Sequence, residues 1–254
     1  IMNKKLCDIG VIGLGVMGKN LIFNLAEKGI SVAVFNRTKS KIDNLKKEKD
    51  YIEKKMYLTH SLDEFVSSLK SPKIILLMVK SGKSIDEIIS KILPFLKKGD
   101  FILDGGNSYY KDTMDRSVYL KKKGIHFYGI GISGGEKGAR FGPSIMVGGE
   151  KEAWKNLKPI FQKIAARSKV GDIACDFLSE NGAGHYVKMV HNGIEYADMQ
   201  LISESYSLLK NLVTPSNTEL SSLFHNWNTG KLNSYLIEIT SKILAKLDTD
   251  GKPL

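Results

Sequence analysis

The chain has 254 residues, 42% of them hydrophobic, and carries a formal net charge of +11. This hydrophobic content is too high for an intrinsically disordered protein, and the length suits one large domain or two smaller ones. The longest purely apolar stretch, Ile74–Val79, is far shorter than the roughly 20 residues that a membrane-spanning helix requires. We therefore expect a globular protein with no membrane partner.

The positive charge raises the possibility of a nucleic-acid partner, but its composition argues against one. Only four of the 38 basic residues are arginines, whose planar guanidinium is preferred for reading guanine and phosphate. The lysine runs are scattered over several expected helix ends and loops, as on an ordinary solvated surface. We expect no nucleic-acid partner.

The cysteines and the first residues of the chain bear on where in the cell the protein is located. Two cysteines, Cys7 and Cys175, make neither a disulfide framework nor a zinc-ligand pattern, so we expect both to be structural and predict no metal site. No apolar signal segment precedes the first strand-like run. These features favour the cytoplasm.

Up to about residue 178, short β-rich runs alternate with amphipathic segments. The runs expected as strands are Asp8–Ile12, Ser31–Phe35, Lys73–Val79, Phe101–Asp104, Ile125–Tyr128 and Ser144–Val147. The segments expected as helices are Val16–Lys28, Lys41–Glu48, Leu62–Leu69, Ile85–Leu96, Tyr110–Lys123 and Glu150–Ile164. Capping boxes are predicted at the pairs Ser61/Glu64 and Ser84/Glu87. This alternation predicts an α/β fold: a doubly wound, mostly parallel Rossmann-type sheet.

After residue 178 the strand pattern stops. Ser179–Asn211 predicts one long helix that Pro215 ends, and shorter helical patterns follow at Ser216–Trp227 and Leu232–Leu247. The sequence therefore predicts two domains, residues 1–178 and an all-helical region, residues 179–254. We expect the second to be only the beginning of a longer domain, because no further helix follows to cover the apolar residues of the long one.

The first expected strand runs into the turn Gly13-Leu14-Gly15-Val16-Met17-Gly18 and then into the first helix. Glycines at this spacing permit a tight turn, close approach of a pyrophosphate to the helix N-terminus, and close packing of helix on strand. The motif alone is weak, but here a strand precedes it, a helix follows, and a second strand lies about 20 residues on. We predict a dinucleotide site.

The end of the second strand bears on which dinucleotide is bound. An NAD-specific site presents Asp or Glu to the ribose hydroxyls at this point, whereas this chain has Asn36-Arg37-Thr38-Lys39. Arg37 can hold a 2′-phosphate with its planar fork, Asn36 and Thr38 can donate neutral hydrogen bonds, and Lys39 adds charge. The prediction is NADP rather than NAD, the alternative being that Arg37 is an ordinary loop residue.

A polar stripe marks the long helix. Its members, spaced i, i+3, i+4 and i+7, are Lys188, His191, Asn192 and Glu195. Lys188 and Glu195 are two turns apart, about 10.5 Å along the axis, which suits a ligand a few carbons long between a base and an acid. Because the other faces are apolar, we expect this helix to be buried, which favours function over an ordinary solvated face.

Two glycine-rich segments are expected as loops at the carboxyl edge of the sheet, where doubly wound folds bind ligands. They are Gly105–Ser108 and Gly131–Gly138. The Asn107 amide and the Ser133 hydroxyl can orient a polyhydroxylated molecule, although either segment can equally be a tight connector.

Together these residues resemble one family, the decarboxylating, NADP-dependent 6-phosphogluconate dehydrogenases of the pentose phosphate pathway. The matching motifs are Gly13–Asn20, Phe35–Thr38, Asp104–Ser108, Ser133–Gly135, Gly138–Ser144 and the run Gly182–Ile202. The glycine turn is shared with many dehydrogenases, but His185–Tyr196 is highly specific. Lys137 and Tyr109 depart from the family, which usually carries acidic residues there.

The resemblance implies a role for both ends of the polar stripe. Lys188 would be the general base that takes the proton of the C3 hydroxyl, and Glu195 the acid that protonates C1 after carbon dioxide leaves. It implies a substrate-positioning set of Asn107, Ser133, Gly134, Gly135, His191, Asn192 and Tyr196. The implied cofactor contacts are Gly13–Gly18, Asn36–Thr38, Val79, Lys80 and Asn107.

The resemblance also implies 6-phosphogluconate as substrate, ribulose 5-phosphate as product, and a homodimer when the chain is complete. Family members continue for about as many residues again, so we expect the isolated chain to bind NADP but turn over poorly. The alternatives are a 3-hydroxyisobutyrate-type dehydrogenase, whose substrate carries no phosphate, and a nucleotide-binding fragment without turnover.

Overall fold

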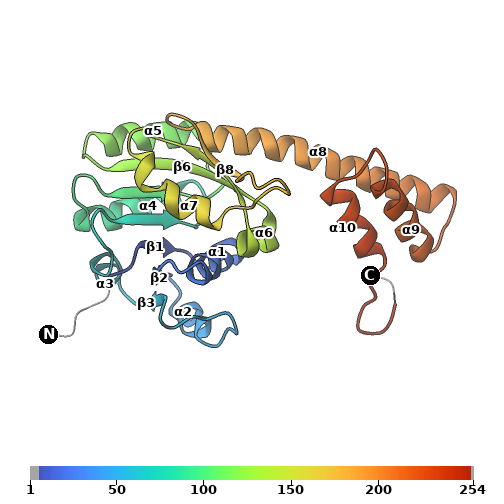
Figure 1. Ribbon diagram of the computed structural model, residues 1–254, viewed down its shortest axis with the longest axis horizontal. Coiled ribbons are helices and arrows are strands. Elements are labelled where there is room, and N and C mark those ends of the chain that lie inside the picture. The colour runs from blue at the N-terminus through green and yellow to red at the C-terminus, as the bar shows by residue number, and fades with distance from the viewer. Residues whose placement is uncertain (1–5, 253–254) are drawn as a thin grey trace. The chain divides into compact units, whose positions relative to one another are not determined.

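A computed structural model describes residues 6–252 of the chain. Contacts divide the chain into two compact units, one ending at Val190 and one beginning at His191. The first is an α/β unit, and the described part of the second is helical (Figure 1).

One eight-stranded sheet forms the centre of the α/β unit, in the order β3-β2-β1-β4-β5-β6-β7-β8. Every neighbouring pair is parallel except β6 with β7, which is antiparallel. The strands are β1 (Ile9–Ile12), β2 (Val32–Phe35), β3 (Met56–Leu58), β4 (Ile74–Leu77), β5 (Phe101–Asp104), β6 (His126–Ser133), β7 (Ser144–Gly148) and β8 (Cys175–Ser179). The strand order reverses between β1 and β4, which opens a crevice at the carboxyl ends of the strands.

Helices connect these strands and cover both faces of the sheet (Figure 1). They are α1 (Val16–Glu27), α2 (Lys39–Leu45), α3 (Leu62–Ser67), α4 (Lys83–Ile92), η1 (Leu93–Phe95), α5 (Tyr110–Lys121), α6 (Gly135–Phe141), η2 (Trp154–Asn156) and α7 (Lys158–Ile164). Helices that connect successive parallel strands are the usual way to bury both faces of a parallel sheet.

Two hydrophobic clusters, one on each face, hold the α/β unit together. Successive residues of a strand point to opposite faces, so Ile74 and Leu76 of β4 enter one cluster while Ile75 and Leu77 enter the other. The first cluster contains residues of α1, α2, α6 and α7, and the second contains residues of α3, α4 and α5. The near-continuous apolar strands are therefore a consequence of a sheet buried on both sides.

The second unit contains most of α8 (Ala183–Leu212), α9 (Asn217–Asn228) and α10 (Tyr235–Leu244). A complete capping box opens α9, in which the Ser216 hydroxyl and the Glu219 carboxylate each accept the other residue's backbone N–H. Helices α9 and α10 pack through buried Leu220, Phe224 and Ile237.

The predicted doubly wound fold is confirmed, and the six predicted strands all occur. Strand β6 is longer than expected and continues to Ser133. Two strands were missed. The first, β3, has only three residues, and the second, β8, lies at the sheet edge with Asp176 and Ser179 exposed, so neither shows the buried apolar run that identified the others.

Several helix boundaries differ from the prediction. The segment expected as one helix, Glu150–Ile164, forms η2 and then α7, because Pro159 favours the first turn of a new helix. The Ser84/Glu87 capping box is absent, since α4 begins two residues earlier than predicted and its N-cap is Gly82. At α3, Ser61 accepts the Glu64 N–H, but the Glu64 carboxylate accepts the N–H of His60, so the predicted box is only half formed.

Burial of the long helix was predicted wrongly for most of its length. Of its residues only Gly184, His185 and Lys188 are buried, while large apolar side chains such as Ile194 and Leu201 are exposed. The apolar residues suggested burial on all sides, but within residues 6–252 many of them remain exposed.

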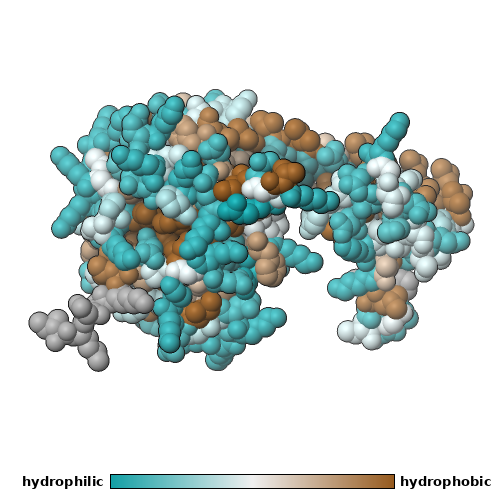
Figure 2. Space-filling view, viewed as in Figure 1, coloured by the Kyte–Doolittle hydropathy of each residue, from teal (hydrophilic) through white to brown (hydrophobic). Residues whose placement is uncertain are grey.

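Hydrophilic residues are prominent on the visible face of the α/β unit (Figure 2). Figure 2 shows hydrophilic residues over much of its visible face, with smaller apolar patches between them. In the described part of the chain, no helix combines the length and hydropathy needed to cross a bilayer.

The second hydrophobic cluster yields a test of stability. Phe65 is fully buried in that cluster, so Phe65→Ala should lower the free energy of unfolding by about 4 kcal/mol in urea titrations. Phe95 is 40% exposed, so the matched variant Phe95→Ala should cost less than about 1 kcal/mol. Equal losses would contradict the assigned core.

Candidate functional site

A pocket of about 380 Å³ opens at the carboxyl edge of the parallel strands, beside the N-terminus of α1. Its lining residues are Gly15, Val16, Met17, Gly18, Met78, Val79, Lys80, Ser81, Gly105, Gly106, Asn107 and Ile132. They come from the turns that follow β1, β4 and β5, from the first residues of α1 and from the end of β6. A pocket of this size at the reversal of strand order is where doubly wound folds bind ligands.

The three turn glycines differ in what surrounds them. Gly13 has φ +115°, and a Cβ there would lie 2.3 Å from the carbonyl oxygen of Met78. A Cβ on Gly18 would lie 2.2 Å from the carbonyl oxygen of Gly13. A Cβ on Gly15 would have no other heavy atom within 4 Å. Two glycines therefore allow the backbone to pack, and the third leaves space above the helix N-terminus, as dinucleotide binding requires.

The residues at the end of β2 are partly engaged by the protein itself. The Asn36 side-chain oxygen accepts the Leu14 N–H at 3.0 Å, and its amide donates to the Thr38 carbonyl at 3.1 Å. Asn36 thus fixes the glycine turn to the end of β2, a role that the sequence did not predict. Arg37 and Thr38 are exposed.

A second hollow of about 360 Å³ shares Gly15 and Val16 with the first pocket. Lys19 of α1 reaches across it to Glu48, with 2.9 Å between Nζ and Oε1. The other lining residues are Leu14, Lys41, Asn44 and Leu45. This hollow extends the site from the glycine turn towards α2.

A buried carboxylate shapes the turn after β5. Asp104 is fully buried; its Oδ1 accepts the Gly106 N–H at 3.0 Å and its Oδ2 accepts the Ser108 hydroxyl at 2.6 Å. Asn107, between these two residues, is exposed at the pocket. Asp104 therefore fixes the backbone of the turn, while the amide side chain of Asn107 remains available to a ligand.

A guanidinium lies behind the same turn. Arg116 of α5 is 8% exposed, and its Nη1 lies 3.7 Å from Asp104 Oδ2. Its Nε and Nη2 donate to the Asp86 carboxylate at 2.7 and 3.1 Å. Burial acts to lower the pKa of Arg116, but the hydrogen bonds to Asp86 together with the negative charges of Asp86, Asp104 and Asp112 outweigh it and hold the pKa above its ordinary value. Arg116 is therefore a permanent cation beneath the site.

The first turn of α8 packs directly on the sheet. A Cβ on Gly184 would lie 2.2 Å from the Gly129 carbonyl oxygen, so only glycine fits. His185 is buried, and its Nδ1 lies 2.7 Å from Thr113 Oγ1. Burial lowers the pKa of His185, although the nearby Asp104 opposes the shift. The sequence did not single out His185 as a site residue, because its importance comes from contacts with distant residues.

Lys188, the predicted base, is buried against β6. Lys188 is 7% exposed, and a Cβ added to Gly131 would lie 2.6 Å from the Cβ of Lys188. The next residue of β6, Ile132, lines the pocket. The structure thus places Lys188 at the pocket end of β6, within the α/β unit.

The segment Gly131–Gly138, expected as a loop, is instead the end of β6 followed by α6. Ser133 is the last, buried residue of the strand, and Gly134 is the N-cap of the helix with φ +132°. The alternation of small and apolar residues in β6 could have indicated a strand, but the glycines suggested a loop.

The remaining predicted substrate residues follow on α8, in the second unit. His191 Nδ1 lies 3.5 Å from Glu195 Oε2 and 3.4 Å from Asn192 Oδ1. Tyr196 is 68% exposed. The spacing of the polar stripe therefore does bring His191 and Glu195 together on one face of a continuous helix.

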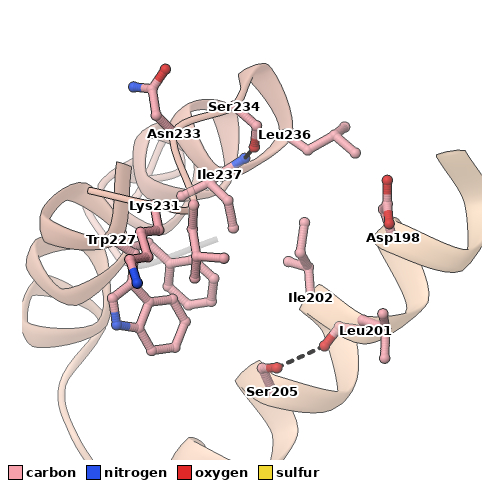
Figure 3. Close-up of a pocket in the computed structure, with 12 residues that line it drawn as sticks. Asp198, Leu201, Ile202, Ser205, Trp227, Lys231, Asn233, Ser234, Leu236 and Ile237 are labelled. Atoms are coloured by element: carbon pink, nitrogen blue, oxygen red, sulfur yellow. Dashed lines mark hydrogen bonds between the residues drawn. The ribbon is translucent and has the colours of Figure 1, made fainter. Parts of the chain in front are cut away.

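A separate groove of about 390 Å³ lies within the second unit, between α8 and the helices α9 and α10. Figure 3 shows Ile202 of α8 across the groove from Ile237 of α10. Its walls are largely apolar, with Asp198 and Lys231 among the polar lining residues. None of the predicted site residues lines this groove.

Among residues 6–252, no group of three or more His, Cys, Asp or Glu side chains is arranged to hold a metal ion.

Comparisons with known proteins identify the family. The family model for the NAD binding domain of 6-phosphogluconate dehydrogenase matches residues 8–175, and the model for the 6-phosphogluconate dehydrogenase C-terminal domain matches residues 184–254. The chain belongs to the 6-phosphogluconate dehydrogenase family. Relatives named 6-phosphogluconate dehydrogenase, decarboxylating, include those of Schizosaccharomyces pombe, 53% identical over 99% of this chain, and Homo sapiens, 52% identical over 97%. The chain spans 51% of each of these relatives, about half their length.

Solved structures agree with this assignment. The 6-phosphogluconate dehydrogenase of Plasmodium falciparum, studied with its cofactor NADP+ and its substrate 6-phosphogluconate, superimposes with a TM-score of 0.89 at 43% identity. The match covers 98% of this chain and 53% of that one. A 3-hydroxyisobutyrate dehydrogenase from Mycobacterium tuberculosis, at 19% identity, a TM-score of 0.72 and coverage of 92% and 74%, shares the fold alone.

The different surroundings of Gly15 and Gly18 predict different tolerance to a methyl group. Gly18→Ala should lower the free energy of unfolding by about 2 kcal/mol, because the new Cβ collides with backbone. Gly15→Ala should change it by less than about 0.5 kcal/mol, because the space is open and φ is −72°. Urea unfolding of both variants tests this, and similar losses would contradict the assigned geometry.

Proposed function

We propose that the whole protein catalyses the oxidative decarboxylation of 6-phosphogluconate to ribulose 5-phosphate and carbon dioxide, with reduction of NADP. This chain would supply the nucleotide-binding unit, the catalytic lysine and part of the C-terminal domain. The observation that carries the proposal is the glycine-turn pocket of a family member together with a buried lysine, Lys188, which packs on the strand whose end lines that pocket. The proposed reaction belongs to the pentose phosphate pathway.

The residues present fit a dinucleotide that carries a 2′-phosphate. Gly15 leaves room for a pyrophosphate at the N-terminus of α1, where backbone N–H groups favour an anion. The end of β2 bears the exposed Arg37 and no carboxylate that would repel a phosphate. The related Plasmodium falciparum enzyme binds NADP+. NADP is therefore the proposed cofactor, bound by Gly13–Gly18, Asn36–Thr38, Val79, Lys80 and Asn107.

In the proposed mechanism two side chains of α8 move protons. Lys188 takes the proton of the C3 hydroxyl through its Nζ. When bound, NADP supplies the acceptor for the hydride that leaves C3. The resulting β-keto acid loses carbon dioxide while Lys188, now charged, polarises the C3 carbonyl, and Glu195 then protonates C1 of the enediol.

The other proposed substrate contacts position the sugar acid. Hydroxyl, amide and imidazole groups can hydrogen bond to its hydroxyls and carboxylate. The proposed set is Asn107, Ser133, Gly134, Gly135, His191, Asn192 and Tyr196. We further propose a homodimer for the complete protein and a cytoplasmic location, which suits the buried thiols of Cys7 and Cys175.

Reversal of the charge at the end of β2 tests the choice of cofactor. Arg37→Glu should weaken NADP binding about a hundredfold, since an attractive pair becomes a repulsive one, but should weaken NAD binding far less. Titration calorimetry with both dinucleotides measures the difference. Arg167→Glu, also on the surface, is the matched control and should leave both affinities unchanged. Equal losses for NADP and NAD in Arg37→Glu would refute the assignment.

Removal of either proton-transfer group tests the mechanism. In the whole protein, Lys188→Ala and Glu195→Ala should each lower kcat by about a thousandfold while NADP affinity is retained. Release of carbon dioxide and ribulose 5-phosphate provides the assay, and Glu204→Ala on the same helix is the control. Full activity in either variant would overturn the proton-transfer roles, and absence of both products from the unmodified protein would overturn the proposed reaction.

A further inference from the structure

Two turns on one side of the crevice are joined from behind by a single side chain. The turn after β4 contributes Met78–Ser81 to the pocket, and the turn after β5 contributes Gly105–Asn107. Both follow strands on the far side of β1 from the end of β2. A dinucleotide lies across such a crevice, so these turns face its nicotinamide half, whereas Arg37 faces its adenosine half.

Arg116 holds the first of these turns. Its Nη2 donates to the Gly82 carbonyl at 3.2 Å, and its fork forms two hydrogen bonds with Asp86 in the first turn of α4. Gly82 is the N-cap of that helix, with φ +82°. A bidentate arginine–carboxylate pair fixes direction as well as distance, so Arg116 sets where the turn after β4 ends.

The same guanidinium also approaches the second turn. Its Nη1 forms no hydrogen bond but lies 3.7 Å from the buried Asp104, which shapes the turn after β5 through Gly106 and Ser108. Charges taken out of water need a partner nearby, so Asp104 and Arg116 are held together. One cation thereby fixes both turns relative to each other.

We propose that Arg116 is a positioning residue for the nicotinamide half of the cofactor. It touches no ligand; it holds the turns bearing Lys80 and Asn107 at the separation that the nicotinamide half needs. This inference rests on the proposed function, because it presumes that NADP occupies the pocket. It predicts that disturbing Arg116 affects one half of the cofactor and not the other.

The test compares two ligands by titration calorimetry on the 254-residue chain. NADP contacts both halves of the crevice, while adenosine 2′,5′-bisphosphate reaches only the adenosine half. Arg116→Lys keeps a charge but loses the bidentate fork, so it should weaken NADP binding about tenfold and leave adenosine 2′,5′-bisphosphate binding unchanged. A merely structural role for Arg116 would weaken both ligands together.

The matched control is Arg140→Lys. Arg140 is also largely buried and pairs with two carboxylates, Glu27 and Asp50, but it contacts neither of the two turns. This variant should leave NADP affinity within about twofold. Equal loss of NADP affinity in both arginine variants would overturn the proposal.

A second variant decides the matter if Arg116→Lys fails to fold. Asp86 is 57% exposed, so Asp86→Asn removes the negative charge and one of the two oxygens that accept from Arg116 without burying a new group. It should weaken NADP about threefold and spare adenosine 2′,5′-bisphosphate. Unchanged NADP binding, or equal weakening of both ligands, would overturn the positioning role. Failure of the unmodified chain to bind either ligand would instead refute the proposed cofactor, and the inference with it.

Discussion

The contact between the first turn of α8 and the sheet determines the geometry of the site. Gly184 meets the carbonyl oxygens of Gly129 in β6 and Met146 in β7 at distances that leave no room for a side chain. Because the helix is anchored there, the residues one turn further on are fixed against β6. His185 contacts Thr113, and Lys188 lies against Gly131. Because α8 packs directly on the backbone of β6 and β7, it has little freedom to rotate or slide. This packing fixes the position of the buried Lys188.

Electrostatics under the pocket add a second constraint. Asp104 has no exposed surface, and leaving a buried carboxylate without partners costs several kcal/mol. It is satisfied by the Gly106 N–H, the Ser108 hydroxyl and the nearby Arg116. The charges of Asp104 and Arg116 therefore lie beneath the turns that line the pocket, where water screens their attraction only weakly. Such a network favours one arrangement of the turns over others.

Sequence reasoning predicted the elements that depend on local pattern. Phe101–Asp104 was identified to the residue, because a buried parallel strand is a short continuous apolar run. The three-residue strand Met56–Leu58 was not, because its pairing with β2 rather than its own pattern makes it a strand. The glycine turn was predicted from spacing and context, and the structure adds which glycines pack and which one faces open space.

The supporting residues of the site lay beyond such reasoning. Arg116 and Asp104 are 12 positions apart, and His185 and Thr113 are separated by 72. Only the tertiary fold brings these groups together, and nothing in the local sequence of Arg116 distinguishes it from a surface arginine on an amphipathic helix. In contrast, the stripe on α8 was visible because helical periodicity alone places its members on one face.

The glycines of β6 affect how mutational tolerance should be interpreted. Gly129 and Gly131 leave one side of the strand bare so that His185 and Lys188 can approach it, and any larger residue would displace them. Gly15 faces open space and would accept a methyl group without strain. A survey of substitutions scored by folding alone would therefore rank the strand glycines as essential and overlook Gly15, although Gly15 lines the pocket. For Gly15, tolerance of a methyl group in the folded chain therefore says nothing about the room that a bound ligand needs.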